Sequence, residues 1–359
     1  MRSINKSQVK KNILFICGSI NQTSMMHNIS GYLKDHNLYF TPYYADGFID
    51  ALATSGLLDF SILGGSFQEN TLEYLKDHNL NVDMKGSMRD YDLVLTCSDL
   101  IIPKNIRNKK IILVQEGMTD PKNIMYYLSK WLKMPRWMAS TSTTGLSGLF
   151  DYFCVASDGY RNHFIKNGIA AEKLVITGIP NYDNCIEYCN NDFPHEGFVL
   201  VATSDSRETF KYENRKKFIL KTKKMAGKRQ LIFKLHPNEN FDRATAEINK
   251  WAPGALVYTS GNVHEMIANC EVLITKYSTV VYTGIALGKE VHSSFDLDEL
   301  RNLAPQQNDG QSAKNIAEVC REHLNDLTFD TSKKKPFREK TQLALKKQVV
   351  RRLKEKLAQ

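Results

Sequence analysis

The sequence contains no long hydrophobic run. No apolar stretch approaches the roughly 20 residues that a helix needs to cross a bilayer. The basic N-terminal stretch MRSINKSQVKKNILFICGS has too few apolar residues before its first glycine to form the core of a signal peptide. We therefore expect a cytoplasmic protein, which could reach a membrane only from its cytoplasmic face.

Ordered cysteine patterns and acidic metal motifs are missing too. The seven cysteines are odd in number and scattered along the chain. Cys185 and Cys189 are four residues apart, but no second His or Cys pair completes a zinc site. No DxD motif stands at the end of a predicted strand. The sequence thus predicts a reduced protein without a structural metal, a metal ion in its site or any other cofactor.

Excess charge is confined to one end of the chain. The net charge is +9, and the segment 332–359 contains the whole excess, with eleven Lys or Arg against two Glu. We therefore do not expect the rest of the chain to be a polyanion-binding surface. No aromatic platform accompanies the charged segment, which argues against nucleic-acid binding.

The basic segment itself predicts a helix that begins at Pro336. Leu345, Val349, Leu353 and Leu357 form a narrow apolar stripe at four-residue spacing on this helix. The basic face, Lys333–Lys356, could rest on an anionic membrane surface. Alternatively, the stripe packs on the first domain and the charged face is solvated.

Apolar strand-like runs alternate with helix-like runs along most of the chain. The buried strands predicted in this way include Asn12–Cys17 and Lys110–Gln115, and the predicted helices include Met25–Asp35, Asn123–Lys133 and Glu208–Met225. Runs that are apolar on both faces indicate a parallel sheet covered by helices. A polar, turn-rich segment, 181–196, separates two such series and is typical of a linker. We therefore predict two Rossmann-like, doubly wound domains facing a central cleft, with one large α/β domain as the alternative. The predicted limits are 1–180 and 197–330 for the domains, and 331–359 for the basic helix.

In the first domain, the loop after the first strand is CGSINQTSMMHNI. Its Gly18, Ser19 and Gln22 lead into a helix, so they predict either a ligand-contacting loop or an ordinary tight turn. The loop does not read GxGxxG and no acidic residue follows in the expected place, which disfavours a nicotinamide cofactor.

An acidic residue ends another strand of the first domain, in ILVQEGMTDP. A carboxylate at a strand tip can take a proton from an attacking hydroxyl, so Glu116, followed by Gly117, is a candidate general base. The alternative is a solvated loop acid or a partner of a helix N-terminus. Asp99 is a weaker candidate for the same role, and Asp46 is weaker still.

The second domain offers phosphate-binding residue types after two of its strands. Arg207, in LVATSDSRETF, has the planar fork that matches a phosphate, although a surface salt bridge is the alternative. In FKLHPNE, Pro237 fixes the backbone after His236, and Lys234 lies two residues earlier on the same face of the strand. An imidazole held in this way can donate to a phosphate oxygen and stabilise a departing nucleotide.

A third strand of this domain runs into Tyr277, Ser278 and Thr279 at the predicted start of a helix of small and apolar residues. Hydroxyls and free N–H groups at a helix start can bind phosphate. Ordinary N-capping by Ser278 is the alternative, and the two roles are compatible.

These motifs together resemble the C-terminal domain of GT-B enzymes that act on nucleotide-activated sugars. The segment EVLITKYSTVVYTGIALGKEV resembles the LITDYSS pattern of CDP-glycerol glycerophosphotransferases, with Lys276 in place of Asp. The HP pair with a later Ser-Thr resembles bacterial sialyl-, polysialyl- and Kdo-transferases. The resemblance implies that Glu116 is the base and that His236, Ser278 and Thr279 hold the nucleotide phosphate.

The chain also resembles non-hydrolysing UDP-N-acetylglucosamine 2-epimerases, in the segment that ends in VITGIPNYD and in LVATSDSRETF. The sequence differs from these epimerases at the residues that carry out their reaction. Asp205 stands where their motif has His, and Tyr282 and Thr283 replace a Glu pair. The acidic residue expected after Glu116 is missing from MASTSTTGLSG. These departures argue against epimerase chemistry and leave the fold prediction intact.

The function expected from the sequence is a metal-independent transfer for surface polysaccharide synthesis. The enzyme would move a sugar, or a glycerophosphate-like group, from a nucleotide-activated donor to a glycan or lipid-linked acceptor. Two alternatives remain at this point. One is an epimerase or hydrolase of sugar nucleotides, and the other is a non-catalytic module that binds a membrane or polyanion through its basic segment.

Overall fold

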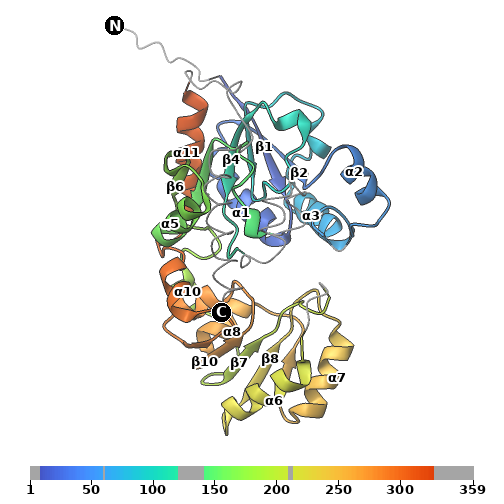
Figure 1. Ribbon diagram of the computed structural model, residues 1–359, viewed down its shortest axis with the longest axis vertical. Helices are drawn as coiled ribbons and strands as arrows, with labels where there is room; N and C mark the ends of the chain where they lie inside the picture. The colour runs from blue at the N-terminus through green and yellow to red at the C-terminus, as the bar shows by residue number, and fades with distance from the viewer. Residues whose placement is uncertain (1–8, 60, 120–140, 209–212, 327–359) are drawn as a thin grey trace, which may run out of the picture. The chain divides into compact units, whose positions relative to one another are not determined.

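The computed structural model describes residues 9–59, 61–119, 141–208 and 213–326 (Figure 1). The chain divides into two compact units. The first contains residues up to Ile179 and those from Ser312 onward, and the second is Pro180–Gln311. The predicted helix over Asn123–Lys133 and the basic segment lie outside the described residues. In the described part of the chain, no helix is both long enough and apolar enough to span a bilayer.

The first unit is built on a six-stranded sheet of order β2-β1-β3-β4-β5-β6, in which every pairing is parallel. Both faces of its central strands are buried, as the unbroken apolar runs predicted. The strands are β1 (Asn12–Cys17), β2 (Asn37–Pro42), β3 (Leu93–Thr96), β4 (Lys110–Val114), β5 (Tyr152–Val155) and β6 (Leu174–Ile176). The described helices are α1 (Ile20–Ser30), α2 (Gly47–Thr54), α3 (Gly65–Asp77), α5 (Asp158–Asn167) and α11 (Ser312–Asn325), with short 3-10 helices η1 (Met84–Gly86), η2 (Lys104–Ile106) and η4 (Ala171–Lys173).

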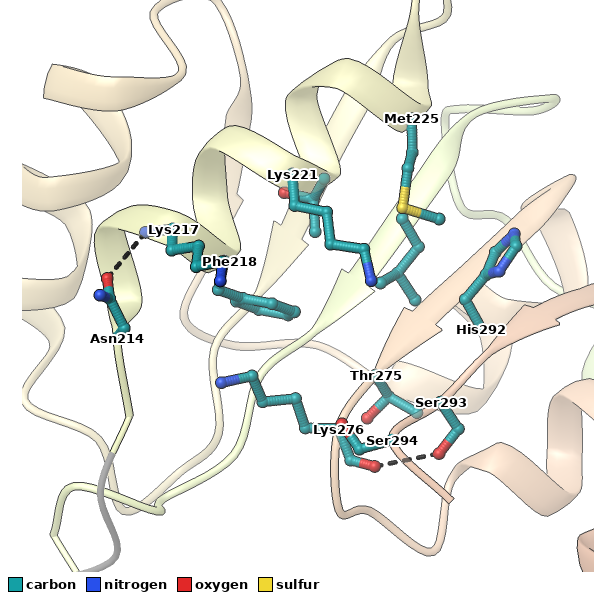
Figure 2. A pocket seen from close by; sticks show the side chains of 12 residues that line it. Asn214, Lys217, Phe218, Lys221, Met225, Thr275, Lys276, His292, Ser293 and Ser294 are labelled. Carbon is teal, nitrogen blue, oxygen red and sulfur yellow. Dashed lines mark hydrogen bonds between the residues drawn. The ribbon is translucent and has the colours of Figure 1, made fainter. Parts of the chain in front are cut away.

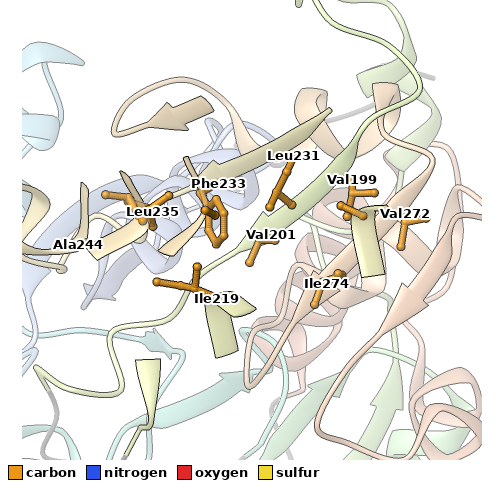
Figure 3. Close-up of a cluster of buried hydrophobic side chains, with 12 residues drawn as sticks. Val199, Val201, Ile219, Leu231, Phe233, Leu235, Ala244, Val272 and Ile274 are labelled. Atoms are coloured by element: carbon orange, nitrogen blue, oxygen red, sulfur yellow. The ribbon is translucent and has the colours of Figure 1, made fainter. Parts of the chain in front are cut away.

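The second unit has a five-stranded sheet of order β11-β10-β7-β8-β9, again parallel throughout. Its strands are β7 (Val199–Ala202), β8 (Leu231–Lys234), β9 (Leu256–Tyr258), β10 (Val272–Thr275) and β11 (Glu290–His292). Its helices are α6 (Arg215–Ala226), α7 (Phe241–Trp251), α8 (Val263–Asn269), α9 (Val281–Ala286) and α10 (Leu297–Leu303), with η5 (Cys185–Cys189). Figure 3 shows side chains of β7, β8 and β10 packing with Ile219 of α6 and Ala244 of α7 in one apolar cluster.

Two boundaries differ from those predicted. Helix α11 groups with the first unit, whereas the sequence assigned residues up to 330 to the second domain. The reason is its packing on α1, together with the 3.0 Å contact between the buried side chains of His323 in α11 and Asp151. The segment predicted as a linker packs on the second unit instead, because Tyr188 of η5 stacks on His264 of α8, with 4.8 Å between ring centroids.

The first residues of two helices also differ from those predicted. The first helix begins at Ile20, five residues before the predicted Met25, because the Ser19 hydroxyl accepts the backbone N–H of Gln22 and caps it. Helix α6 begins at Arg215 rather than at Glu208, with Asn214 as its N-cap residue. In each case the capping side chain, rather than the apolar periodicity, determines where the helix starts.

Candidate functional site

In the first unit, the loops after β1 and β4 meet at Glu116. The Ser19 hydroxyl donates to Glu116 Oε1 at 3.0 Å, and Gln22 Nε2 donates to Glu116 Oε2 at 2.5 Å. Both donors come from the start of α1, almost a hundred residues away along the chain. The structure thus brings together three residues that the sequence singled out separately. It also shows that Glu116 is a half-buried, hydrogen-bonded carboxylate rather than a free loop acid.

Gly18 leaves room for this arrangement. A Cβ atom at Gly18 would lie 2.0 Å from Gln22 Oε1, so any larger residue would push the Gln22 carboxamide away from Glu116. The hydroxyl of Thr71, from α3, donates to the carbonyl of Gly18 at 2.8 Å and holds the loop in place. Gly18 is therefore required because it has no side chain, which leaves room for Gln22, and not because of an unusual backbone conformation.

Gln115 fixes the other side of the cluster, a role that the sequence analysis missed. Its Nε2 donates to the carbonyl of Gly117 at 2.8 Å, and its Oε1 accepts the backbone N–H of Ala156 at 2.9 Å. These bonds close the turn that follows β4 and tie it to the end of β5. Gln115 is thus a positioning residue for Glu116, and Gly117 takes part through its backbone carbonyl.

Burial raises the pKa of the Glu116 carboxyl above its ordinary value, and the hydrogen bonds from Gln22 and Ser19 oppose that shift. A carboxylate with a raised pKa is a stronger base than a solvated one. The arrangement suits proton abstraction from a hydroxyl because the group is held in place and is ionised above its pKa.

This balance gives a testable pH dependence. Because the Gln22 amide stabilises the ionised form, a Gln22→Leu variant should have a Glu116 pKa higher than that of the unchanged protein. A reaction that needs the ionised carboxylate is fully active above this pKa and is lost as the pH falls through it. The acid limb of the pH–rate profile should therefore move to higher pH in Gln22→Leu, as measured by the release of nucleotide from a donor, the reaction that the sequence predicts. An acid limb that stays in place would show that Glu116 is not the titrating group.

The two weaker acidic candidates have structural roles. Asp99 is fully buried and accepts the backbone N–H groups of Gly145 and Ser147 at 2.9 and 2.8 Å. Asp46 precedes α2 and accepts the backbone N–H of Lys104. Each carboxylate thus holds a loop of the first unit.

In the second unit, the loop after β8 holds His236 by its backbone and its ring. The His236 N–H reaches Glu239 Oε2 at 2.9 Å and Thr203 Oγ1 at 3.0 Å, and the Asn238 N–H donates to His236 Nδ1 at 3.2 Å. Because Nδ1 accepts a hydrogen bond, the neutral ring carries its proton on Nε2. Burial lowers the pKa of His236 and favours that neutral form, although Asp205 acts in the opposite direction. The ring is thus a fixed neutral donor.

A buried ion network lies beneath this loop, and the sequence analysis missed it. Arg215 of α6 pairs with Glu239 and lies 3.5 Å from Glu213, which pairs in turn with Lys276 at 3.3 Å. Thr203 donates to the other oxygen of Glu239. Glu239 was visible in the HPNE motif, but its side-chain partners Arg215 and Thr203 lie 24 and 36 residues away in the sequence. No local pattern could have connected them.

Two predicted phosphate ligands are engaged elsewhere in the unit. Arg207 places both terminal nitrogens on the carboxylate of Glu247 in α7, each at 2.9 Å, which is the salt bridge considered as its alternative role. Lys234 is buried, and its ammonium donates to the carbonyls of Leu235 and Thr259 at 3.0 and 3.3 Å. Burial lowers the pKa of Lys234. Phosphate binding by either residue remains a prediction. It would require the side chain to give up these contacts and bind the phosphate instead.

Ser278 and Thr279 precede α9, which begins at Val281 with Val280 as its N-cap residue and no side-chain cap. Ser278 therefore does not cap the helix. Neither hydroxyl has a hydrogen-bond partner in the described part of the chain. The end of β10, which they follow, is separated from the end of β8 by β7 alone, a spacing of about 10 Å. His236 and the two hydroxyls thus follow strands whose carboxyl ends lie at one edge of the second sheet, and their joint binding of a phosphate remains a prediction.

The sequence matches no protein-family model and no curated protein. Solved structures do resemble the chain. The S. aureus MnaA–UDP co-structure is 12% identical with a TM-score of 0.57, and the match covers 89% of this chain and 98% of that chain. The UDP-GlcNAc 2-epimerase from Neisseria meningitidis bound to UDP-GlcNAc is 12% identical with a TM-score of 0.52, covering 87% and 100%. The wall teichoic acid polymerase TagF is 13% identical with a TM-score of 0.47, covering 90% and 91%.

At these identities the similarity shows the fold alone. The chain consists of two parallel-sheet α/β units of the GT-B type, which confirms the predicted fold class. The resemblance to UDP-N-acetylglucosamine 2-epimerases is confirmed as a resemblance of fold. The TagF score is too low to carry an argument, so kinship with the glycerophosphotransferases remains a prediction.

Proposed function

We propose that this chain is a glycosyltransferase, or a glycerophosphotransferase-like enzyme, that uses a nucleotide-activated donor. The second unit binds the nucleotide phosphate of the donor. The first unit activates a hydroxyl of a glycan or lipid-linked acceptor. The observation that carries the proposal is the fixed, neutral imidazole of His236, with its Nε2 proton available as a hydrogen-bond donor at the carboxyl end of β8.

The chemistry follows from these groups. Glu116 takes the proton from the acceptor hydroxyl, whose oxygen forms the new bond to the transferred group. The bond between that group and the nucleotide phosphate breaks, and its electron pair stays on the phosphate. His236 Nε2 donates a hydrogen bond to the departing phosphate, and the hydroxyls of Ser278 and Thr279 add further donors. Such donors stabilise developing negative charge without a metal ion.

The environment of residues 282 and 283 argues against an epimerase. The Glu pair of those enzymes is replaced here by Tyr282, which is 1% exposed, and Thr283, which is fully buried. The Thr283 hydroxyl is hydrogen-bonded to His264 Nδ1 at 2.8 Å. These two residues therefore offer no exposed carboxylate in place of that Glu pair.

The role of His236 can be tested by ligand-induced stabilisation. A panel of CMP, CDP, UDP, GDP and TDP should contain one nucleotide that raises the melting temperature. A ligand at 100 times its dissociation constant contributes about 2.7 kcal/mol of stability. His236→Ala should remove most of that shift because it removes the phosphate donor. Differential scanning fluorimetry of the full chain is sufficient to measure the effect.

A matched control comes from His195, a partly buried histidine of the same unit whose ring contacts the Tyr258 hydroxyl at 3.0 Å and is not among the residues predicted to bind the nucleotide. His195→Ala should leave the nucleotide shift unchanged even if it lowers the melting temperature without ligand. An equal loss of shift in both variants, or no loss in His236→Ala, would remove His236 from the site.

A further inference from the structure

The second unit contains a basic pocket between α6 and the carboxyl ends of β10 and β11 (Figure 2). Its volume is about 220 Å³. Pockets that enclose drug-sized ligands usually have volumes of roughly 300–1,000 Å³, so this one suits a single small unit rather than a whole nucleotide. The pocket is lined by Asn214, Lys217, Phe218, Lys221, Thr222, Met225, Ile274, Thr275, Lys276, His292, Ser293 and Ser294.

The lining contains no acidic residue. Acidic side chains outside the pocket contact only some of its basic residues. Lys276 pairs with Glu213 at 3.3 Å, and His292 lies 2.8 Å from Glu290. Lys217 and Lys221, one helical turn apart on α6, have no ion-pair partner among the residues that the structure describes. Figure 2 shows Lys221 extending from α6 toward the strands, with Lys276 and His292 on the strand side. The pocket therefore favours an anion.

A buried hydroxyl in the wall points to a ligand independently of charge. Thr275, at the end of β10, is 3% exposed, and its Oγ1 is buried without a hydrogen-bond partner in the described part of the chain. A buried polar atom without a partner costs about 1–3 kcal/mol, so such atoms are rare unless a ligand or water completes them. Thr275 can supply one hydrogen bond to a bound molecule.

The remaining wall is apolar. Phe218 and Met225 from α6 face Ile274 from β10. The Lys276 ammonium lies 4.7 Å from the centroid of the Phe218 ring, in a cation–π contact that holds both side chains. The pocket thus combines free ammonium groups, a hydroxyl and a flat apolar surface. The C–H face of a sugar ring packs on such a surface while its charged substituent meets the lysines.

We propose that this pocket binds a phosphorylated sugar unit. Lys217 and Lys221 contact the phosphate, Thr275 bonds an oxygen of the ligand, and Phe218 supports the ring. None of the predicted donor-binding residues, His236, Ser278 and Thr279, lines the pocket. The assignment therefore stands on the second unit alone and does not rest on the proposed transferase activity. A sugar phosphate bound here is a second ligand, separate from the nucleotide.

Isothermal titration of the full chain with glucose 6-phosphate, at low salt, tests the assignment. Lys221→Gln should raise the dissociation constant about tenfold, because it removes one charge-assisted contact. Thr275→Val should weaken binding in the same direction while keeping the shape of the side chain. Lys223→Gln removes the same charge from an exposed position of α6 that does not line the pocket, so its dissociation constant should stay within about twofold of the unchanged protein.

Ligand comparisons sharpen the test. Glucose should bind far more weakly than glucose 6-phosphate if the phosphate is recognised, and inorganic phosphate should bind more weakly if the apolar wall contributes. Four results would overturn the assignment. They are no binding of glucose 6-phosphate, equal weakening in Lys223→Gln, tighter binding of glucuronate, and displacement of glucose 6-phosphate by the nucleotide that stabilises the chain. The last result would make the pocket part of the nucleotide site, and tighter glucuronate binding would make it a carboxylate site.

Discussion

Glu116→Gln is expected to lower the rate of group transfer by about 10²–10⁴, the usual contribution of a positioned general base. The substituted amide has nearly the same shape as the carboxyl group but cannot accept a proton. Nucleotide binding should be unchanged, because the phosphate donors belong to the second unit. The rate is measured as the release of nucleotide from a preferred donor, and binding as the thermal shift.

Glu73→Gln provides a control for the loss of one negative charge, since Glu73 is an exposed residue of α3 in the same unit. Its rate should equal that of the unchanged protein. Gly18→Ala should lie between the two, because the added Cβ displaces Gln22 from Glu116 without removing the carboxylate. A Glu116→Gln enzyme that transfers at the full rate would exclude Glu116 as the base.

Arg215→Met is expected to destabilise the second unit by about 3–5 kcal/mol, the cost of removing one partner of a buried ion pair. Arg215 is buried, and its loss leaves the carboxylates of Glu213 and Glu239 without their main counter-charge. Because Glu239 also accepts the backbone N–H of His236, the variant should weaken nucleotide binding as well. Urea denaturation gives the free energy of unfolding.

Arg243→Met is the matched control. Arg243 pairs with Glu208 on the surface of the same unit, so its loss should cost less than about 1 kcal/mol. If Arg215→Met also cost less than 1 kcal/mol, then the network would not hold the loop after β8. The position of His236 would in that case need another explanation.

Much of the fold follows from apolar runs. The runs at Asn12–Cys17 and Lys110–Gln115 were expected to be buried strands and became β1 and β4. β2, with the sequence NLYFTP, was not anticipated because a Thr and a Pro interrupt its apolar character. Pro42 is tolerated there as the last residue of an edge strand, where its missing N–H costs no ladder bond.

The sequence could predict a site residue only where a chemically suitable side chain directly follows a predicted strand. Glu116 and His236 both follow apolar runs, and parallel strands place their carboxyl ends at one edge of a sheet. The bonding partners of these side chains could not be predicted, because they lie far away in the sequence. Gln22 reaches Glu116 across 94 residues, and Arg207 is held by Glu247 across 40. Neither pairing leaves a trace in local spacing, so only the folded structure shows that Glu116 is hydrogen-bonded and that Arg207 is already engaged.

The most direct test is incubation of the full chain with nucleotide sugars, with and without glycan acceptors, followed by mass spectrometry of the products. The proposed function predicts free nucleotide and an acceptor extended by one unit. Both should depend on the acceptor and persist in EDTA, and neither should form with Glu116→Gln. An isomerised nucleotide sugar formed without any acceptor, or donors returned unchanged while an acceptor is present, would contradict it.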